Sequence, residues 1–190
     1  MMHETPQEST TAHQVGQPPK VGEFAPSLGK DIQIPSGKPM LVVFLRHCGD
    51  PFAVKIFKSL TSISNHHPEV RCVAVSQCSQ ADTDDWIVHA GGEWEVEIVI
   101  DEPRALYAEW GLRENSTWSA MNPLALWRAY KLGTEEGMWN REFKTGSKWQ
   151  MGGAFGIDAN GYVRWSKPAA TPDEVPDLKE GLKALGVSAA

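Results

Sequence analysis

The chain has 190 residues, a formal net charge of −6, and 41% apolar and 22% charged residues. This size and apolar content fit one soluble globular domain with an extension. The acidic balance and the lack of a basic stretch exclude nucleic acid as an expected partner. No apolar run approaches the roughly 18 residues that span a bilayer, so no membrane contact is expected either.

Residues 1–20 are predicted to be a flexible tail, because they are polar and rich in Thr, Gln, Ser and Pro. They lack the apolar segment of a secretory signal. The three cysteines, Cys48, Cys72 and Cys78, do not form a closed disulfide set. We therefore expect a single domain over residues 21–187 and a cytoplasmic, reducing location.

Strands and helices alternate through the first half of the chain, as hydrophobic periodicity and cap residues indicate. In chain order, we predict strands at residues 31–34, 40–46, 70–76 and 95–101, and helices at 51–65, 80–90 and 103–110. Cys72 alternates with valines inside a buried strand and is predicted to be a core thiol. Cys78 follows the end of that strand and is predicted to be partly exposed.

The second half begins with an irregular stretch over residues 113–150. Within it, Asn122-Pro123 predicts a helix start and Gly133 a helix end. Such a long irregular stretch is usually functional or disordered, and its aromatic residues argue against disorder. Asn160-Gly161 then predicts a β-hairpin, and Thr171 opens a capping box for a last helix.

This order predicts an α/β fold with a central mixed sheet and helices on both faces. The chain also carries eight tryptophans, all between Trp86 and Trp165. Most of them are predicted to pack in the core. The alternative is that some line a pocket for a flat apolar or aromatic ligand.

The most informative segment is the junction at residues 46–52, RHCGDPF, which follows a buried apolar run. Asp50 is a favoured helix N-cap, and Pro51 suits the first helical position because its missing N–H would be unpaired there. We call residues 46–52 the corner. It joins a strand to a helix with three chemically active side chains, His47, Cys48 and Asp50.

Three stretches resemble a known family: VVFLRHCGDPFAVKIF, MNPLALWRAYKLG and SKWQMGGAFGIDANGYVRW. With the order of elements, they resemble the peroxiredoxin-like (AhpC/TSA-type) branch of the thioredoxin-fold superfamily, fungal members in particular, over about residues 20–186. The resemblance implies a thioredoxin-like fold with an aromatic-rich helical insertion before the C-terminal hairpin and helix. Relatives often pair, so a homodimer is one state that the resemblance implies.

In this family the corner usually reads Gly-Cys-Pro-Phe, with a reactive cysteine and sometimes a second one three positions later. Here those positions hold Asp50 and Ala53, so the redox motif is degenerate. A carboxylate cannot form a sulfenic acid, so peroxide reduction at position 50 is lost. Cys48 matches a cysteine that some fungal members carry before the glycine.

Each corner side chain has a functional and a structural interpretation. The helix N-terminus should lower the pKa of Asp50 and keep it ionised, as a cap and as a candidate base or electrostatic stabiliser. Cys48 is the remaining redox candidate if His47 and Arg46 lower its pKa, or a bystander thiol otherwise. His47 is either a general acid/base or a hydrogen-bonded loop histidine.

A substrate pocket is expected beside this corner, because the resemblance places the segment around Gln150 against it. The candidate pocket residues are Arg46, Phe52, Trp118, Trp149, Gln150, Gly152 and Gly153. Trp149 would form a wall, Gln150 would hydrogen-bond a ligand, and the glycines would allow close approach. No metal site and no cofactor are predicted, since no phosphate loop or dinucleotide fingerprint is present.

Three functions remain open at this point. The first, which we favour, is a non-redox enzyme of isomerase, lyase or cyclase type in small-molecule biosynthesis, acting on an aromatic or polyketide-like metabolite through Asp50. The second is a residual thiol peroxidase or reductase working through Cys48. The third is a non-catalytic binding or scaffold protein. An open pocket at Asp50 would favour the first, and a closed corner the third.

Overall fold

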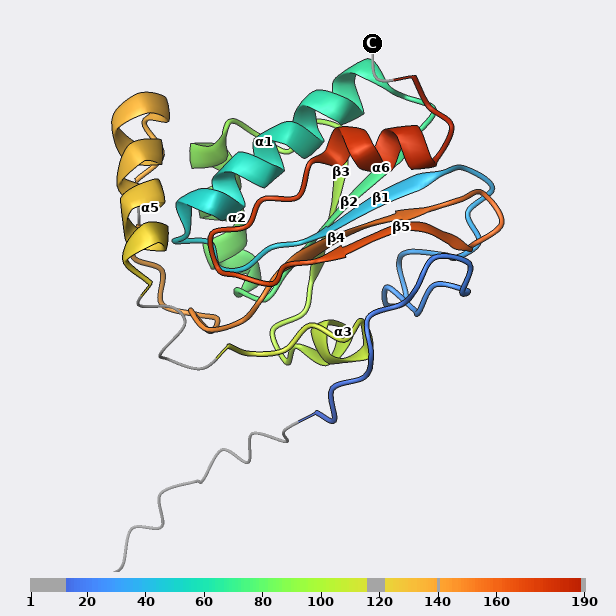
Figure 1. The fold of residues 1–190 in the computed structure, drawn as a ribbon, viewed down its shortest axis with the longest axis horizontal. Coiled ribbons are helices and arrows are strands. Elements are labelled where there is room, and N and C mark those ends of the chain that lie inside the picture. The colour runs from blue at the N-terminus through green and yellow to red at the C-terminus, as the bar shows by residue number, and fades with distance from the viewer. Residues whose placement is uncertain (1–12, 116–121, 140, 189–190) are drawn as a thin grey trace, which may run out of the picture.

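In a computed structural model of the protein, we describe residues 13–115, 122–139 and 141–188. They form a five-stranded mixed sheet in the order β3-β2-β1-β4-β5 (Figure 1). The three strands β1, β2 and β3 are parallel, and β4 and β5 add an antiparallel pair beside β1. The strands are Met40–Phe44 (β1), Arg71–Ser76 (β2), Val96–Ile100 (β3), Gly153–Ile157 (β4) and Val163–Pro168 (β5).

Helices cover both faces of this sheet, as the order of elements predicts. The helices are Pro51–His66 (α1), Gln80–Ala90 (α2), Ala105–Glu109 (α3), Pro123–Glu136 (α5) and Leu178–Ala184 (α6). Figure 1 shows α1 and α6 on one face and α3 on the other, with α5 standing beside the start of α1. The predicted fold class, a mixed sheet flanked by helices in thioredoxin-like order, is confirmed.

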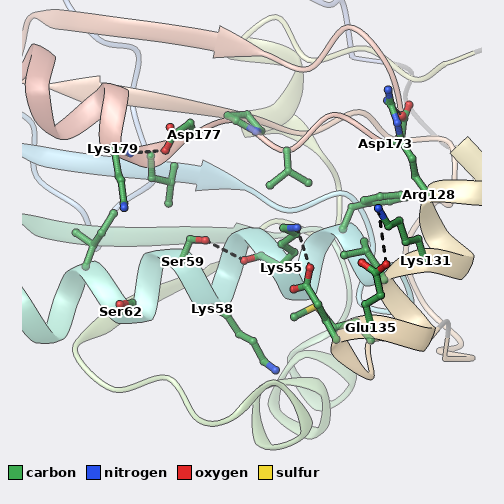
Figure 2. A pocket seen from close by; sticks show the side chains of 18 residues that line it. Lys55, Lys58, Ser59, Ser62, Arg128, Lys131, Glu135, Asp173, Asp177 and Lys179 are labelled. Atoms are coloured by element: carbon green, nitrogen blue, oxygen red, sulfur yellow. Dashed lines mark hydrogen bonds and ion pairs between the residues drawn. The ribbon is translucent and has the colours of Figure 1, made fainter. Parts of the chain in front are cut away.

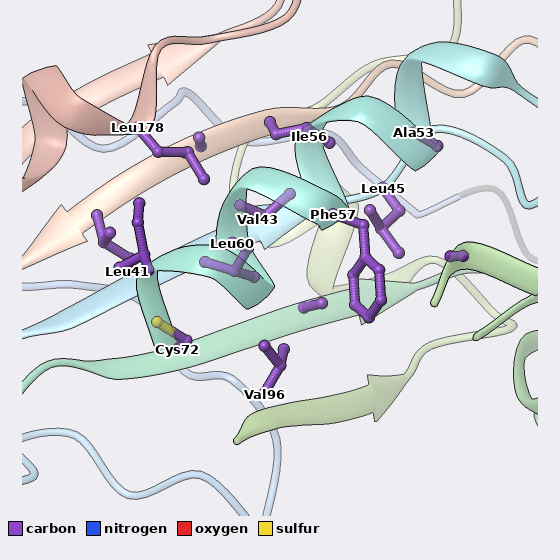
Figure 3. Close-up of a cluster of buried hydrophobic side chains, with 14 of the residues drawn as sticks. Leu41, Val43, Leu45, Ala53, Ile56, Phe57, Leu60, Cys72, Val96 and Leu178 are labelled. Atoms are coloured by element: carbon purple, nitrogen blue, oxygen red, sulfur yellow. The ribbon is translucent and has the colours of Figure 1, made fainter. Parts of the chain in front are cut away.

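The core lies in two layers, one on each face of the sheet. Alternate residues of β1 point to opposite sides because side chains alternate along a strand. Leu41 and Val43 meet α1 and α6 in one cluster, whereas Val42 and Phe44 meet α3 and the segment before β1 in the other. Figure 3 shows the first cluster, in which Leu60 and Phe57 of α1 lie over the sheet.

The helix starts follow the capping residues that the sequence displays. Asp50 caps α1 and accepts the N–H of Phe52 at 3.3 Å, with Pro51 as the first helical residue. Asn122 caps α5 in the same way through the N–H of Leu124 at 3.0 Å. Asp101 accepts three backbone N–H groups at the start of α3, from Ala105, Leu106 and Tyr107.

Three predicted boundaries are wrong. Residues 31–34 form no strand. Helix α5 continues through Gly133 and ends at Gly137, which has the left-handed conformation that favours glycine. Gly133 serves packing instead, since a Cβ there would overlap the ring of Trp139. Helix α6 starts after Asp177 rather than after Thr171, and the residues between form a turn at Thr171–Glu174 followed by an irregular segment.

The N-terminal segment contacts helix α3. The Gly16 N–H donates to the Ala108 carbonyl at 2.8 Å, so part of the predicted tail contacts α3.

The core prediction for most tryptophans is wrong among the seven described: three are buried and four are exposed. The buried ones are Trp86, Trp110 and Trp165, and the exposed ones are Trp94, Trp127, Trp139 and Trp149. Trp118 lies outside the described residues.

Within the described ranges, no helix is both long enough and apolar enough to cross a membrane.

Leu60→Ala is expected to lower the free energy of unfolding by about 2–5 kcal/mol, because it leaves a cavity under α1. Leu60 is fully buried, whereas Leu126 on α5 is 63% exposed. Leu126→Ala is the matched control and should change stability by less than about 0.5 kcal/mol. Urea unfolding measures both, and equal effects of the two substitutions would contradict the described core.

Candidate functional site

The candidate site lies where β1 and β2 end. Parallel neighbours end at the same edge of a sheet, so the loops that follow them meet there. Cys48 follows β1 and Cys78 follows β2, and both thiols are buried at this edge. The Tyr107 hydroxyl of α3 lies 2.6 Å from the Leu45 carbonyl oxygen and 2.9 Å from that of Val75, which ties the two strand ends together.

Cys48 and Cys78 are hydrogen-bonding partners. The Cys48 backbone N–H donates to the Cys78 Sγ at 3.5 Å. The Ser76 hydroxyl lies 3.8 Å from the Cys48 Sγ and accepts the Cys78 N–H at 3.3 Å. Thr83 of α2 completes this group, with its hydroxyl 2.9 Å from that of Ser76. A dithiol with two hydroxyl neighbours is therefore enclosed at the strand ends.

The contacts between Cys48 and Cys78 shift the pKa values of the two thiols in opposite directions. Donation from the Cys48 thiol and from its backbone N–H lowers the pKa of Cys78. The same thiol–thiol hydrogen bond, together with burial, raises the pKa of Cys48. The prediction that Arg46 and His47 lower the pKa of Cys48 is therefore wrong. The prediction that Cys78 is partly exposed is also wrong, since none of it is exposed.

Cys72 is a buried core thiol, as predicted, and burial raises its pKa to about 12.

Asp50 is the N-cap of α1, as predicted, and it pairs with Arg46, whose Nη1 lies 3.3 Å from the Asp50 Oδ2. Its pKa was expected to fall. Burial instead raises the pKa of Asp50 to about 6, although Arg46 and the N–H groups of α1 act in the opposite direction. Desolvation of the charge outweighs the helix field here.

Residues 141–150 lie over the corner, and we call them the covering segment. Arg46 holds this segment through the carbonyl oxygens of Lys148, at 2.8 Å from Nη2, and Gln150, at 3.4 Å from Nε. Gln77, the residue after β2, also holds it, accepting the N–H of Ser147 and donating to the Ser147 carbonyl, both at 2.7 Å. The irregular stretch thus has a defined conformation where it crosses the corner.

His47 is buried, and both of its ring nitrogens are engaged. Its Nδ1 accepts the N–H of Gly49 at 3.0 Å, so Nε2 carries the proton and donates to the Thr145 carbonyl at 2.9 Å. Burial lowers the pKa of His47, which favours this neutral form. In this conformation His47 fastens the covering segment and has no nitrogen left for a substrate.

Two glycines allow the covering segment to approach the corner closely. Gly146 has a positive φ of 82°, and a Cβ at this position would lie 3.0 Å from the Cys78 Sγ. A Cβ on Gly49 would overlap the carbonyl oxygen of Arg141, whose N–H donates to the Gly49 carbonyl at 3.0 Å. The segment therefore excludes solvent from the thiols.

The predicted pocket residues are brought together only in part. Arg46, Phe52, Gly152 and Gly153 line a cavity of about 20 Å³ beside Asp50. The Gln150 side chain points elsewhere and donates to the Leu112 carbonyl at 3.0 Å.

Trp149 is 39% exposed and does not line this cavity, and Trp118 lies outside the described residues. A cavity of this size holds about one water molecule, so the corner is closed in this conformation. The substrate-binding roles of the seven residues stay predictions.

The sequence interpretation missed Cys78 as a site residue. The signal was present: two cysteines each follow a predicted parallel strand, and neighbouring parallel strands end at one edge. The ion pair between Lys55 of α1 and Glu136 of α5, at 3.0 Å, was also missed, because no local sequence motif indicates it. Across the described ranges, no group of three or more His, Cys, Asp or Glu side chains is placed to hold a metal ion.

Asp50→Asn is expected to flatten the pH dependence of stability. The Asp50 pKa is about 6 in the folded protein and 3.8 ordinarily. Between these values the folded state binds more protons, so stability falls as pH rises through this window. The contribution is present below about pH 4, is lost above about pH 6, and is on the order of 2–3 kcal/mol.

Urea unfolding over this pH range measures the effect. Asp177→Asn, the same change at the exposed N-cap of α6, is the control and should leave the pH dependence of the wild type intact. Parallel stability curves for Asp50→Asn and the wild type would contradict the described environment of Asp50.

Solved structures with a similar fold include two that match most of the chain. A thiol peroxidase from Chromobacterium violaceum has a TM-score of 0.61 and 15% identity, covering 91% of this chain and 90% of its own. A peroxiredoxin-like protein from Aquifex aeolicus has a TM-score of 0.63 and 15% identity, covering 90% and 89%. At this identity they establish the shared fold alone.

No curated protein matches the sequence significantly. A family model described as AhpC/TSA antioxidant enzyme matches residues 57–170, which is more than half of the chain. Together with the mixed sheet and its peroxiredoxin-like neighbours, this match identifies the chain as a member of the AhpC/TSA family.

Proposed function

We propose that the protein is a peroxide-consuming dithiol oxidoreductase in which Cys78 and Cys48 form the redox pair. The observation that carries this proposal is the direct contact between the two buried cysteines, in which the Cys48 N–H donates to the Cys78 Sγ at 3.5 Å. Membership of the AhpC/TSA family supports it. The sequence pointed to Cys48 as the reactive thiol, whereas the hydrogen bonds favour Cys78, since they lower its pKa.

The proposed reaction balances with one peroxide and two thiols. The Cys78 thiolate attacks a peroxide oxygen, so an S–O bond forms, the O–O bond breaks, and the departing oxygen leaves as an alcohol or water after taking a proton. Cys48 then attacks the Cys78 sulfur, and the hydroxyl leaves as water with the Cys48 proton. The peroxide gains two electrons, and an external dithiol restores the pair by exchange.

The closed corner is expected to slow the entry of peroxide to the Cys78 thiol. Peroxide reaches Cys78 only when the covering segment moves away from it, because Gly146 lies directly over the sulfur. The segment is held by polar bonds from Arg46, His47 and Gln77, and its Phe143 is only partly buried where it packs against the core. Local opening of such a segment costs less free energy than global unfolding. The reaction rate is therefore expected to follow this opening.

Stoichiometric hydrogen peroxide is expected to remove the mass of two hydrogen atoms from the protein, because a Cys48–Cys78 disulfide forms. Intact-mass spectrometry and peptide mapping measure this change. Cys48→Ser should instead add one oxygen atom at Cys78, since no thiol remains to displace the hydroxyl. Cys78→Ser should show neither change.

Cys72→Ser is the matched control and should behave as the wild type, because Cys72 lies inside β2 away from the pair. An unchanged wild-type mass after peroxide treatment would overturn the proposal. So would a disulfide that includes Cys72.

A second candidate function uses Asp50, and one observation favours it: a carboxyl with a pKa of about 6 is suited to acid–base catalysis near neutral pH. In this alternative the protein is a non-redox isomerase, lyase or cyclase for an aromatic or polyketide-like metabolite. Asp50 would remove a proton from an activated carbon, and Arg46 would stabilise the resulting anion. The cavity beside Asp50 would first have to enlarge, through movement of Phe52.

Aryl 1,3-diketones in deuterated water test this candidate, because a base at Asp50 would exchange their activated protons. The expected result is deuterium incorporation by the wild type above the protein-free rate, with an apparent pKa near 6, and only the protein-free rate with Asp50→Asn. Exchange by Asp50→Asn at the wild-type rate would exclude Asp50 as the base. Failure of both the peroxide and the exchange tests would leave the non-catalytic binding role.

A further inference from the structure

A groove of about 870 Å³ lies between α1, α5 and the segment that enters α6. Its volume lies in the usual range of small-molecule sites. The groove follows α1 from Phe52 to Ile63, a span of about 16 Å at the rise of an α-helix. Figure 2 shows α1 along this groove, with α5 at one end and α6 near the other.

The floor of the groove is apolar. Phe52, Leu132 and Met138 form one small cluster at the α5 end, and Val175 packs against it. Ile63 of α1 and Leu178 of α6 line the other end. Val175 packs against both groups, so apolar side chains from α1, α5, α6 and the residues that flank these helices extend along the groove, which suits an aliphatic chain.

The charges around the floor are unequal. Five cationic and four acidic side chains line the groove, although the whole chain carries a net charge of −6. Lys55 pairs with Glu136 at 3.0 Å, Lys131 pairs with Glu135 at 3.7 Å, and Arg128 pairs with Asp173.

The fourth acid, Asp177, caps α6 by accepting the backbone N–H of Lys179 at 3.0 Å. Lys58 and Lys179 therefore have no carboxylate partner among the described residues. Figure 2 shows Lys179 extending from α6 toward α1, where Ser62 lies on the same wall.

We propose that this groove binds an aliphatic monocarboxylate, with its carboxylate at Lys179 and Ser62 and its chain along the floor toward Phe52. One uncompensated ammonium beside a hydroxyl suits a single negative charge, and the Lys58 charge adds to the local attraction. The apolar floor supplies most of the affinity by excluding water from the chain. This site is separate from the thiol pair, because neither thiol lines the groove, whereas Phe52 lines both the groove and the cavity beside Asp50.

Isothermal titration calorimetry with dodecanoate below its micellar concentration tests the proposal. One molecule should bind per chain, and dodecanol and dodecyltrimethylammonium should bind more weakly because they lack the negative charge. Lys179→Gln should weaken dodecanoate binding by up to about fivefold, the scale of one exposed charge pair. Lys183→Gln, on the same helix but outside the groove, is the matched control and should leave binding unchanged.

Met138→Glu is a second variant, which places a charge at the chain end of the groove; circular dichroism checks that it folds. It should abolish dodecanoate binding. Absence of saturable binding to the wild type would overturn the proposal. Equal effects of Lys179→Gln and Lys183→Gln, or full binding by folded Met138→Glu, would also overturn it.

Discussion

The parallel pairing of β1 with β2 is the constraint on which the rest of the site depends. Because both strands end at one edge of the sheet, their pairing brings the polar side chains of Arg46, His47 and Gln77 together at the end of the hydrophobic core. Buried polar groups need partners. The covering segment supplies them through its backbone and in doing so closes the corner over the two thiols.

The ionisable groups beneath the covering segment have pKa values that are shifted in different directions. Burial opposes charge, and it outweighs the helix N-terminus at Asp50, whose pKa is about 6. At the thiols, the hydrogen bond between Cys48 and Cys78 divides the pair, with the pKa lowered at Cys78 and raised at Cys48. Two thiols with oppositely shifted pKa values therefore lie beside the corner, while the carboxylate of Asp50 occupies the start of α1. The second sulfur comes from the neighbouring strand rather than from the helix.

The sequence predicts the fold well because its signals are local. The Asp50 and Asn122 caps, the Asn160-Gly161 turn and the apolar strands each act over a few residues, and all appear in the structure. The site is harder to predict because burial is set by distant residues. The pKa of Asp50, the enclosure of Cys78 and the orientation of Gln150 all depend on where the covering segment lies.

Redox equilibration tests the central claim, the Cys48–Cys78 couple, most directly. The protein is equilibrated in mixtures of reduced and oxidised dithiothreitol, quenched with acid, and alkylated after denaturation. We expect one two-electron transition in which Cys48 and Cys78 lose their alkylation together while Cys72 remains alkylated throughout. Full alkylation of all three cysteines at every ratio would contradict it.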